Sequence, residues 1–390
     1  MLSTLVVNIK GERGSPGILN VVNGGSVISP AFIIAFAGSE IPLYAIFDIQ
    51  GESSRVFSEG QFGLAAGRDS VGYLTISKGG YLDTSLSLSN FIGISGGTGF
   101  VSVSGEKSVW NAGNITLGLD STGVLKISDN ATLKAKSINV DSKGRGWVII
   151  GDRKNQESTG YIDSDSISLI PANSFLILNY TPKDYKTLWD LSGKGSIIFK
   201  NGIANIYGVN SISGNAAIND AGIVVWNNSA LSKTSPLFMT QKGSVDLNGF
   251  SQIFGSYSSS GTTYFNQKAN AAGTVLTVNG NYHGYGGTLV FNTALESDSS
   301  KTDFLHITGN VDGGTNVKVN NLGGKGSQTI EGIRLITVDG EIAKGTEFRQ
   351  NGRIVAGAYD YRLVQGGQGG NNNSWYLTSR AGGVDPIAPP

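Results

Sequence analysis

The sequence contains no cysteine, two histidines, nine prolines and few charged residues. The absence of cysteine excludes a disulfide framework and a thiolate metal site. It also fits a chain that crosses an oxidising compartment before it folds. Charged residues make up 15% of the chain, and the formal net charge is zero. We therefore expect no nucleic-acid partner, because binding a phosphate backbone requires a basic surface.

Long apolar runs are also missing. The most apolar stretch, Ala31 to Ala37, is much shorter than the ~18 residues of a membrane span and has no basic flank, so it is not a signal peptide. No apolar pattern of helical period reaches a convincing length. What the chain has instead is 57 glycines, which indicate many tight turns.

A short strand-like unit recurs in the first half of the chain. Each copy begins with a small residue and continues with alternating apolar and polar residues: 17–21, 45–49, 72–76, 99–103 and 123–127. The copies that begin at Gly72, Gly99 and Gly123 are 27 and 24 residues apart. Strands repeated at this spacing indicate a solenoid, since a propeller blade needs about 40–45 residues. We predict an all-β fold, a right-handed parallel β-helix that forms a single elongated rod.

The repeat is interrupted near residues 152–190. The charged segment 152–157 and the polar segment 161–165 predict an irregular loop that leaves the rod. A candidate binding surface borders this loop, because aromatic and basic side chains occur there together: Tyr161, Lys183, Lys186 and Trp189. Tyr185 is more simply explained by core packing. The remaining tryptophans of the first part are predicted to pack between coils: Trp110, Trp147 and Trp226.

Catalytic and metal-binding patterns are missing. A serine triad needs a histidine base and a carboxylate near the nucleophile, but His283 lies in a glycine-rich turn and His306 alternates with apolar strand residues. Asp163 and Asp165 form the one tight aspartate pair, which we expect to be solvated. We therefore predict no catalytic residues, no metal site and no cofactor.

Two segments carry a family resemblance. Residues 179–222 include Asn179-Tyr180-Thr181, Gly195-Ser196-Ile197-Ile198 and Asn210-Ser211, and they resemble the passenger repeat of diffuse-adherence-adhesin and antigen-43 autotransporters. Ile212 departs from that repeat, which usually has tyrosine there. The second segment resembles the pertactin-like autochaperone region, and its matching stretches are Gly286-Gly287-Thr288-Leu289, Lys301-Thr302-Asp303, Val319-Asn320-Asn321, Gly352 to Tyr361 and Trp375-Tyr376-Leu377.

This resemblance implies an organisation for the whole chain. Residues 1–267 would be β-helix passenger, residues 268–380 an autochaperone cap, and residues 381–390 the start of a linker to an outer-membrane β-barrel that the chain lacks. In this family the autochaperone leaves the membrane pore first and templates the coils that follow. Aromatic strand residues suit such a cap, because they bury a large area. The folding residues expected here are Tyr359, Asp360, Tyr361, Leu363, Trp375, Tyr376 and Leu377.

The resemblance further implies a passenger that reaches the bacterial cell surface through the periplasm. Its expected function is adhesion, with a host surface protein or glycan as partner, or self-association between cells. One alternative is a virulence passenger that recruits a host protein such as an actin regulator, with this chain as the stalk. Another is a polysaccharide-acting β-helix enzyme, which would need clustered carboxylates in a groove.

Overall fold

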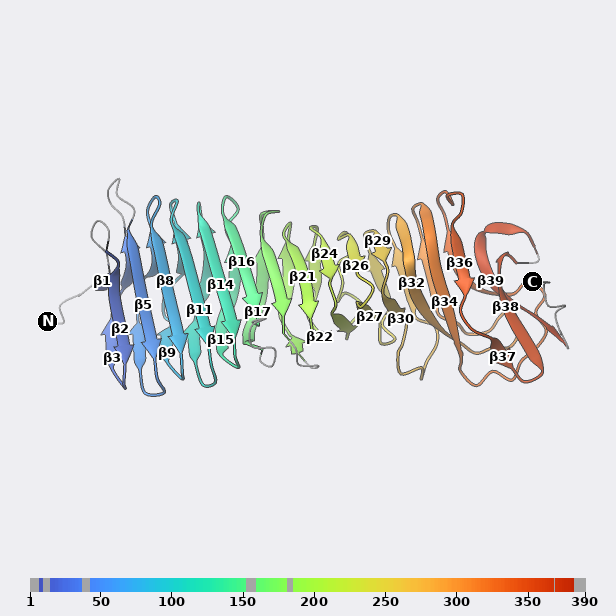
Figure 1. Cartoon of the computed structure of the whole chain (residues 1–390), viewed down its shortest axis with the longest axis horizontal. Coiled ribbons are helices and arrows are strands. Elements are labelled where there is room, and N and C mark those ends of the chain that lie inside the picture. Colours follow the sequence, from blue (N-terminus) through green and yellow to red (C-terminus); the bar gives the residue numbers. More distant parts are fainter. Residues whose placement is uncertain are drawn as a thin grey trace. The chain divides into compact units, whose positions relative to one another are not determined.

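A computed structural model describes residues 7–9, 15–36, 43–151, 159–180, 185–367 and 369–381, and these residues form strands and turns (Figure 1). The chain divides into two compact units, residues 1–215 and 216–390. In each unit successive strands pair in parallel with strands one coil away, so the predicted parallel β-helix is confirmed. Among the described residues there is no helix with the length and apolar character that a membrane crossing requires.

Unit 1 is a solenoid whose coils contribute strands to three faces. The first face contains β2 (Gly17–Val22), β5 (Tyr44–Gln50), β8 (Val71–Ser77), β11 (Thr98–Ser104), β14 (Thr122–Ser128), β16 (Arg145–Ile150), β18 (Phe175–Asn179), β19 (Tyr185–Thr187), β21 (Ser196–Asn201) and β22 (Ile203–Ile206). The second contains β3 (Ser26–Ser29), β6 (Arg55–Ser58), β9 (Tyr81–Thr84) and β12 (Val109–Ala112). The third contains β1 (Val7–Ile9), β4 (Phe32–Phe36), β7 (Phe62–Ala66), β10 (Asn90–Ile94), β13 (Asn114–Leu119), β20 (Asp190–Gly193) and β23 (Asn210–Ile212). The longer strands β15 (Thr132–Val140) and β17 (Tyr161–Leu169) run from the second face into the third.

The predicted repeat is the first face of unit 1. Gly17 pairs with Ala45, and Gly72, Gly99 and Gly123 follow in the same row. Alternate residues of these strands point inward, so that each strand adds a layer to a continuous apolar core. The glycines are required by close packing, because a Cβ on Gly123 would lie 2.4 Å from the carbonyl oxygen of Ile92. The repeated sequence therefore contains both a strand of the first face and the tight corner of the coil that precedes this strand.

The prediction of a loop near residues 152–190 is wrong for most of the residues that the structure describes in this range. Residues 161–169 form β17 and residues 175–179 form β18, and both strands pair with the preceding coil. The polar residues that suggested a loop, among them Asp163 and Asp165, are the outward residues of β17. Residues 152–158 and 181–184 lie outside the described residues. Outward positions of a solenoid tolerate polar side chains without interrupting the strand, so polarity is weak evidence for a loop here.

Unit 2 begins as a solenoid and ends as an antiparallel sheet. One sheet contains β24 (Ala216–Ile218), β25 (Gly222–Val225), β26 (Leu237–Met239), β27 (Ser244–Asp246), β29 (Tyr257–Ser259), β30 (Thr262–Tyr264), β32 (Tyr282–Thr293), β34 (Val311–Asn321) and β36 (Glu347–Gln350). The second sheet contains β28 (Gln252–Phe254), β31 (Val275–Val278), β33 (Phe304–Ile307), β35 (Ile333–Val338), β37 (Ile354–Ala356), β38 (Tyr359–Gly366) and β39 (Asn371–Ala381).

The tryptophans predicted to pack between coils differ in their burial. Trp110 is fully buried and contacts Phe62 across the core of unit 1, as predicted. Trp147 and Trp226 are partly exposed, so neither lies in the core, but Trp147 stacks on Phe175 of the next coil at 6.3 Å, which agrees with the prediction of packing between coils. Trp147 is an outward residue of β16, where alternation places every second side chain outside.

Candidate functional site

The candidate site is the end of unit 2, where strand pairing changes direction. β28, β31, β33 and β35 pair in parallel, one strand per coil. β39 then pairs antiparallel with β35 on one side and with β38 on the other, and β37 completes the sheet. The open edge that a parallel solenoid would expose at β35 is therefore occupied by the chain itself. We call β37, β38 and β39 the cap sheet.

The cap sheet contains all seven residues that the sequence singled out for folding. Tyr361, Trp375, Tyr376 and Leu377 are buried, while Tyr359, Asp360 and Leu363 are partly exposed. Leu363 and Leu377 are paired residues of β38 and β39. The seven residues lie on β38 and β39, and the structure shows that these two separate segments are neighbours in the cap sheet.

A column of buried aromatic rings joins the solenoid of unit 2 to the cap sheet. Successive ring centroids lie 5.1, 5.7, 5.9 and 4.7 Å apart along the series Phe254, Tyr257, Tyr282, Phe348 and Trp375. Aromatic pairs at these separations add about 0.5–1.5 kcal/mol each beyond the area they bury. The rings come from β28, β29, β32, β36 and β39, and the step from Tyr282 to Phe348 passes over β34, which pairs with both β32 and β36, so the column connects the solenoid with the last strand.

The two tyrosines of the column keep hydrogen-bond partners inside the core. The Tyr257 hydroxyl lies 2.6 Å from Thr263 Oγ1, and the Tyr282 hydroxyl lies 2.9 Å from Thr315 Oγ1. Burial raises the pKa of Tyr257 to about 12 and also raises the pKa of Tyr282. Both hydroxyls therefore stay neutral at physiological pH, which suits a structural role in an apolar core.

Backbone segments around the cap sheet are fixed by a few polar side chains. The Tyr361 hydroxyl donates to the carbonyl oxygen of Glu296 (2.8 Å) and accepts from the Ser327 N–H (3.0 Å). The Asp298 carboxylate accepts from the N–H groups of residues 330, 331 and 332, at 2.9–3.3 Å. Partial burial alone would raise the pKa of Asp298, but these three donors outweigh it and lower the pKa. The loop before β33 is thus tied to the loop before β35.

Asp360 has a different role from its neighbours in the list. Arg353 donates to it through two nitrogens, Nε and Nη2, each 2.7 Å from a carboxylate oxygen. This bidentate pair lowers the pKa of Asp360 and spans the hairpin of β37 and β38. Because Arg353 is exposed and Asp360 is partly exposed, we expect the pair to orient the hairpin rather than to stabilise it strongly.

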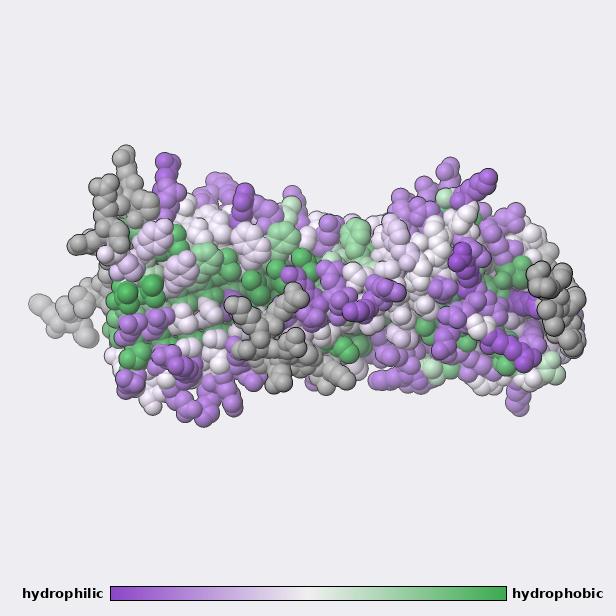
Figure 2. All heavy atoms as spheres, viewed as in Figure 1, coloured by the Kyte–Doolittle hydropathy of each residue, from purple (hydrophilic) through white to green (hydrophobic). Residues whose placement is uncertain are grey.

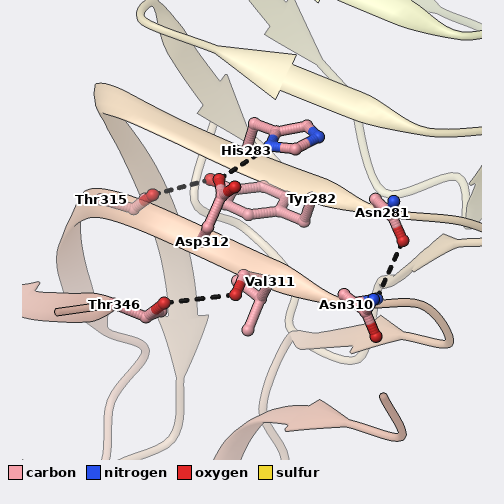
Figure 3. A network of polar contacts seen from close by, with 8 residues as sticks. All are labelled: Asn281, Tyr282, His283, Asn310, Val311, Asp312, Thr315 and Thr346. Carbon is pink, nitrogen blue, oxygen red and sulfur yellow. Dashed lines mark hydrogen bonds and ion pairs between the residues drawn. The ribbon is translucent and has the colours of Figure 1, made fainter. Parts of the chain in front are cut away.

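Both histidines pair with an aspartate of the following coil. His283 Nδ1 lies 2.7 Å from Asp312 Oδ1 (Figure 3), and His306 Nε2 lies 2.8 Å from Asp339 Oδ2. The same two coils are joined at Asn281, whose side-chain oxygen accepts from the Asn310 N–H at 3.0 Å (Figure 3). His283 and Asp312 occupy equivalent positions of β32 and β34, so their contact helps to fix the register of these strands, whereas Asp339 lies two residues beyond Thr337, the partner of His306 in β35. Within the described ranges no three acidic, histidine or cysteine side chains gather as a metal site would require.

The candidate binding surface near Tyr161 is only partly present. Tyr161 is 51% exposed and Lys186 is also exposed, so both stay candidates. Trp189 is 3% exposed, and its prediction as a surface residue is wrong because the side chain belongs to the core of unit 1. Tyr185 is buried, as core packing requires, and lies between Tyr161 and Tyr180 at 6.3 and 5.0 Å. Lys183 lies outside the described residues.

Sequence reasoning missed two parts of the cap: most of the aromatic column and Asp298. Phe254 and Tyr257 lie upstream of residue 268, where the cap was predicted to begin. The available signal was the presence of two aromatic residues, three positions apart, among the glycine and serine of 254–259. Asp298 lies in a polar loop whose composition gives no hint that three N–H groups converge on it.

Comparison with known families finds a match in the last part of the chain. Residues 251–363 match the family model described as Autochaperone Domain Type 1. The matched range includes Tyr359, Asp360, Tyr361 and Leu363, whereas residues 375–377 lie beyond its end. It also includes Phe254 and Tyr257, so the match begins where the aromatic column begins.

Three curated relatives are proteins of Escherichia coli. The uncharacterized protein YuaQ is 35% identical over 221 residues, which are 56% of this chain and 16% of that protein. The uncharacterized protein YdeU is 45% identical over 125 residues, 32% of this chain and 26% of that protein. The autotransporter adhesin AIDA-I is 42% identical over 116 residues, 29% of this chain and 9% of that protein. The chain therefore spans about a quarter or less of the length of these three relatives.

Proposed function

We propose that this chain, which is part of an autotransporter passenger exported to the bacterial cell surface, serves in adhesion and starts its own folding from its carboxyl-terminal end. The observation that carries the proposal is the match of residues 251–363 to the autochaperone family. The boundaries of the proposal are those expected from the sequence: passenger from residue 1 to 267, cap from 268 to 380 and linker from 381.

The proposed folding role is supported by the construction of the cap. Parallel strands with distant partners nucleate slowly, because loop-closure entropy must be overcome before any pairing is gained. The cap sheet avoids much of this cost, since β37 and β38 form a hairpin and β39 pairs with β38 across a short connection. Once formed, the cap sheet holds Trp375 against Phe348. Further coils can then add in one direction only, away from the cap sheet.

The proposed adhesive role is supported by the relative named as an autotransporter adhesin. In this proposal the passenger contacts a host surface protein or glycan, or a passenger on a neighbouring cell. Weak contacts suffice, because many copies on one cell raise the avidity. We propose no enzymatic reaction, because the relative with a described role is named as an adhesin.

Display on a non-adherent bacterium tests the adhesive role. The chain is displayed through the membrane domain of an autotransporter, and binding to epithelial cells and settling of the culture are measured. We expect binding or settling with the whole chain, and loss of both when residues 1–215 are deleted while surface display is kept. If the displayed whole chain gives neither, adhesion is contradicted. The alternative of a stalk for a host-protein-recruiting passenger would then be favoured.

A further inference from the structure

A cavity of about 250 Å³ opens in unit 2 between the first residues of β32 and β34 and the loop that precedes β36. Its polar lining consists of five side chains: Asn281, His283, Asn310, Asp312 and Glu341. All five are exposed or partly exposed. A small polar ligand can therefore enter the cavity without a change in the chain.

Two asparagines of the cavity have their side-chain oxygen engaged and their nitrogen free. The Asn281 oxygen accepts from the Asn310 N–H at 3.0 Å (Figure 3), and the Asn310 oxygen accepts from the Glu341 N–H at 2.9 Å. Since a backbone N–H needs an acceptor, these contacts fix the orientation of both amides. Among the described residues neither amide nitrogen has a hydrogen-bond partner, so both are donors available to a ligand.

The acceptors of the cavity are carboxylate oxygens. Asp312 uses one oxygen for His283 Nδ1, 2.7 Å away (Figure 3), which leaves its second oxygen and the His283 Nε2 for a ligand. The Glu341 carboxylate has no partner in the part of the chain that the structure describes. Donors and acceptors thus occur side by side in one small cavity.

Hydroxyl groups fit this mixture better than an ion does. An ammonium group only donates, so it would leave the two amide nitrogens without acceptors. A carboxylate only accepts, and Asp312 and Glu341 would repel it, with no lysine or arginine among the described lining residues to offset them. A hydroxyl group both donates and accepts. Hydrophilic and neutral residues also cover most of the visible surface over β32, β34 and β36 (Figure 2), which suits a polar ligand.

The apolar part of the cavity suits the C–H face of a sugar ring. Its apolar side chains are those of Val311, Ile342 and Ala343. The volume lies slightly below the range of about 300–1,000 Å³ that is usual for drug-sized ligands, which favours a single ring. Beside the cavity, the exposed ring of Tyr285 lies 6.5 Å from that of His283 at 24° and offers a flat surface to a neighbouring sugar.

We propose that this cavity binds one neutral sugar ring, with Asn281 and Asn310 as donors and Asp312 as an acceptor. Neutral sugars occur on host glycans and on the surface polysaccharide of the bacterium itself. The last residues of unit 2 are proposed to lead to the membrane, so the polysaccharide of the same cell is the nearer source. The inference goes beyond the proposed adhesion, which is expected to be lost with residues 1–215, because those residues contribute nothing to the cavity.

The two histidines of the chain make the site directly measurable, because His283 lines the cavity and His306 does not. Methyl glycosides of glucose, galactose, mannose and fucose are titrated while the ring C–H signals of both histidines are followed by NMR. We expect at least one glycoside to shift the His283 signals saturably, with a Kd on the order of 1 mM, and to leave those of His306 unchanged. No shift with any glycoside, equal shifts at both histidines, or tighter binding of methyl glucuronide contradicts the proposal.

Paired variants test the amide donor. Asn310→Asp replaces the free nitrogen by oxygen and keeps the oxygen that accepts from the Glu341 N–H, so it should raise the Kd at least about tenfold. Asn351→Asp makes the same change at an exposed asparagine outside the cavity and should change the Kd less than about twofold. Thermal midpoints check that both variants fold. Equal effects of the two substitutions would contradict the donor role.

Two coated surfaces distinguish the sources of the sugar. The purified chain is applied to lipopolysaccharide with a neutral polysaccharide and to mucin freed of sialic acid. We expect binding to the lipopolysaccharide that the active glycoside competes and that Asn310→Asp weakens. Competed binding to the mucin alone would overturn the same-cell source. Because both measurements use the purified chain, their failure is separate from a failure of displayed cells to adhere.

Discussion

Trp375 joins the cap sheet to the aromatic column, because its ring packs edge-on against Phe348 at 4.7 Å and it is 3% exposed. Replacing it with alanine should lower the free energy of unfolding of unit 2 by about 3–5 kcal/mol, the usual cost of removing a buried large aromatic. Urea unfolding followed by circular dichroism measures this loss. Tyr285→Ala is the control, since Tyr285 is 68% exposed, and it should change stability by less than about 0.5 kcal/mol.

Asp298 should make the stability of unit 2 depend on pH in the acid range. Its pKa is lower in the folded chain than the ordinary value of 3.8, so its contribution to stability is complete above 3.8 and is lost as the pH falls through the lower folded-state value. Asp298→Asn should lower stability at neutral pH and flatten the fall in stability below pH 3.8. Thermal midpoints between pH 2 and 7 give the comparison. A variant whose profile stays parallel to that of the wild type would show that the three N–H contacts do not set this dependence.

The sequence did not reveal which residues of adjacent coils contact each other in the cap. The alternation in 304–307 correctly predicted that His306 faces away from Leu305 and Ile307. It did not predict that His306 lies beside Asp339, 33 residues later. That distance along the chain depends on the length of each coil, and the turns vary in length without changing the strand pattern.

At the scale of elements, glycine corners and alternating strands were predictable, whereas the change of strand direction was not. Gly72, Gly99 and Gly123 mark the coil repeat because close backbone packing leaves no room for a side chain. The antiparallel pairing of β39 with β35 joins segments about 40 residues apart, and its strands have the same alternation as the parallel ones. Local pattern distinguishes strand from loop, but it does not distinguish parallel from antiparallel partners.

Deleting residues 354–381 should test the cap sheet as a folding element. The deletion removes β37, β38 and β39 and leaves the edge of β35 unpaired. We expect refolding from urea to slow at least about tenfold and the product to aggregate, because an open parallel edge recruits other chains.

A deletion at the opposite end of the chain is the matched control. Removing residues 1–42 takes away the first coil and should leave the refolding rate within about twofold, since this coil is the last to add in the proposed direction. Equal slowing by both deletions would contradict a folding role that belongs to the carboxyl-terminal end.

At the scale of the whole molecule, the two units should differ in their ability to fold alone. Residues 216–390 contain the matched autochaperone domain and the aromatic column. We expect this fragment to fold by itself, with a cooperative thermal transition. Residues 1–215 have core of their own but no cap, and they should refold slowly and aggregate unless residues 216–390 are covalently attached. Circular dichroism and size-exclusion chromatography of the separate fragments measure both outcomes, and rapid independent folding of residues 1–215 would contradict the expected order.

The central place of β39 in its sheet has a mechanical consequence. β39 is 11 residues long and is hydrogen-bonded on both sides, to β35 and to β38. A pull along this strand from its carboxyl end loads the bonds of both ladders in shear, so that they resist together instead of opening one after another. If the chain is anchored to a cell through that end, the element that closes the solenoid is also the element that first carries tension when the cell is dragged by flow.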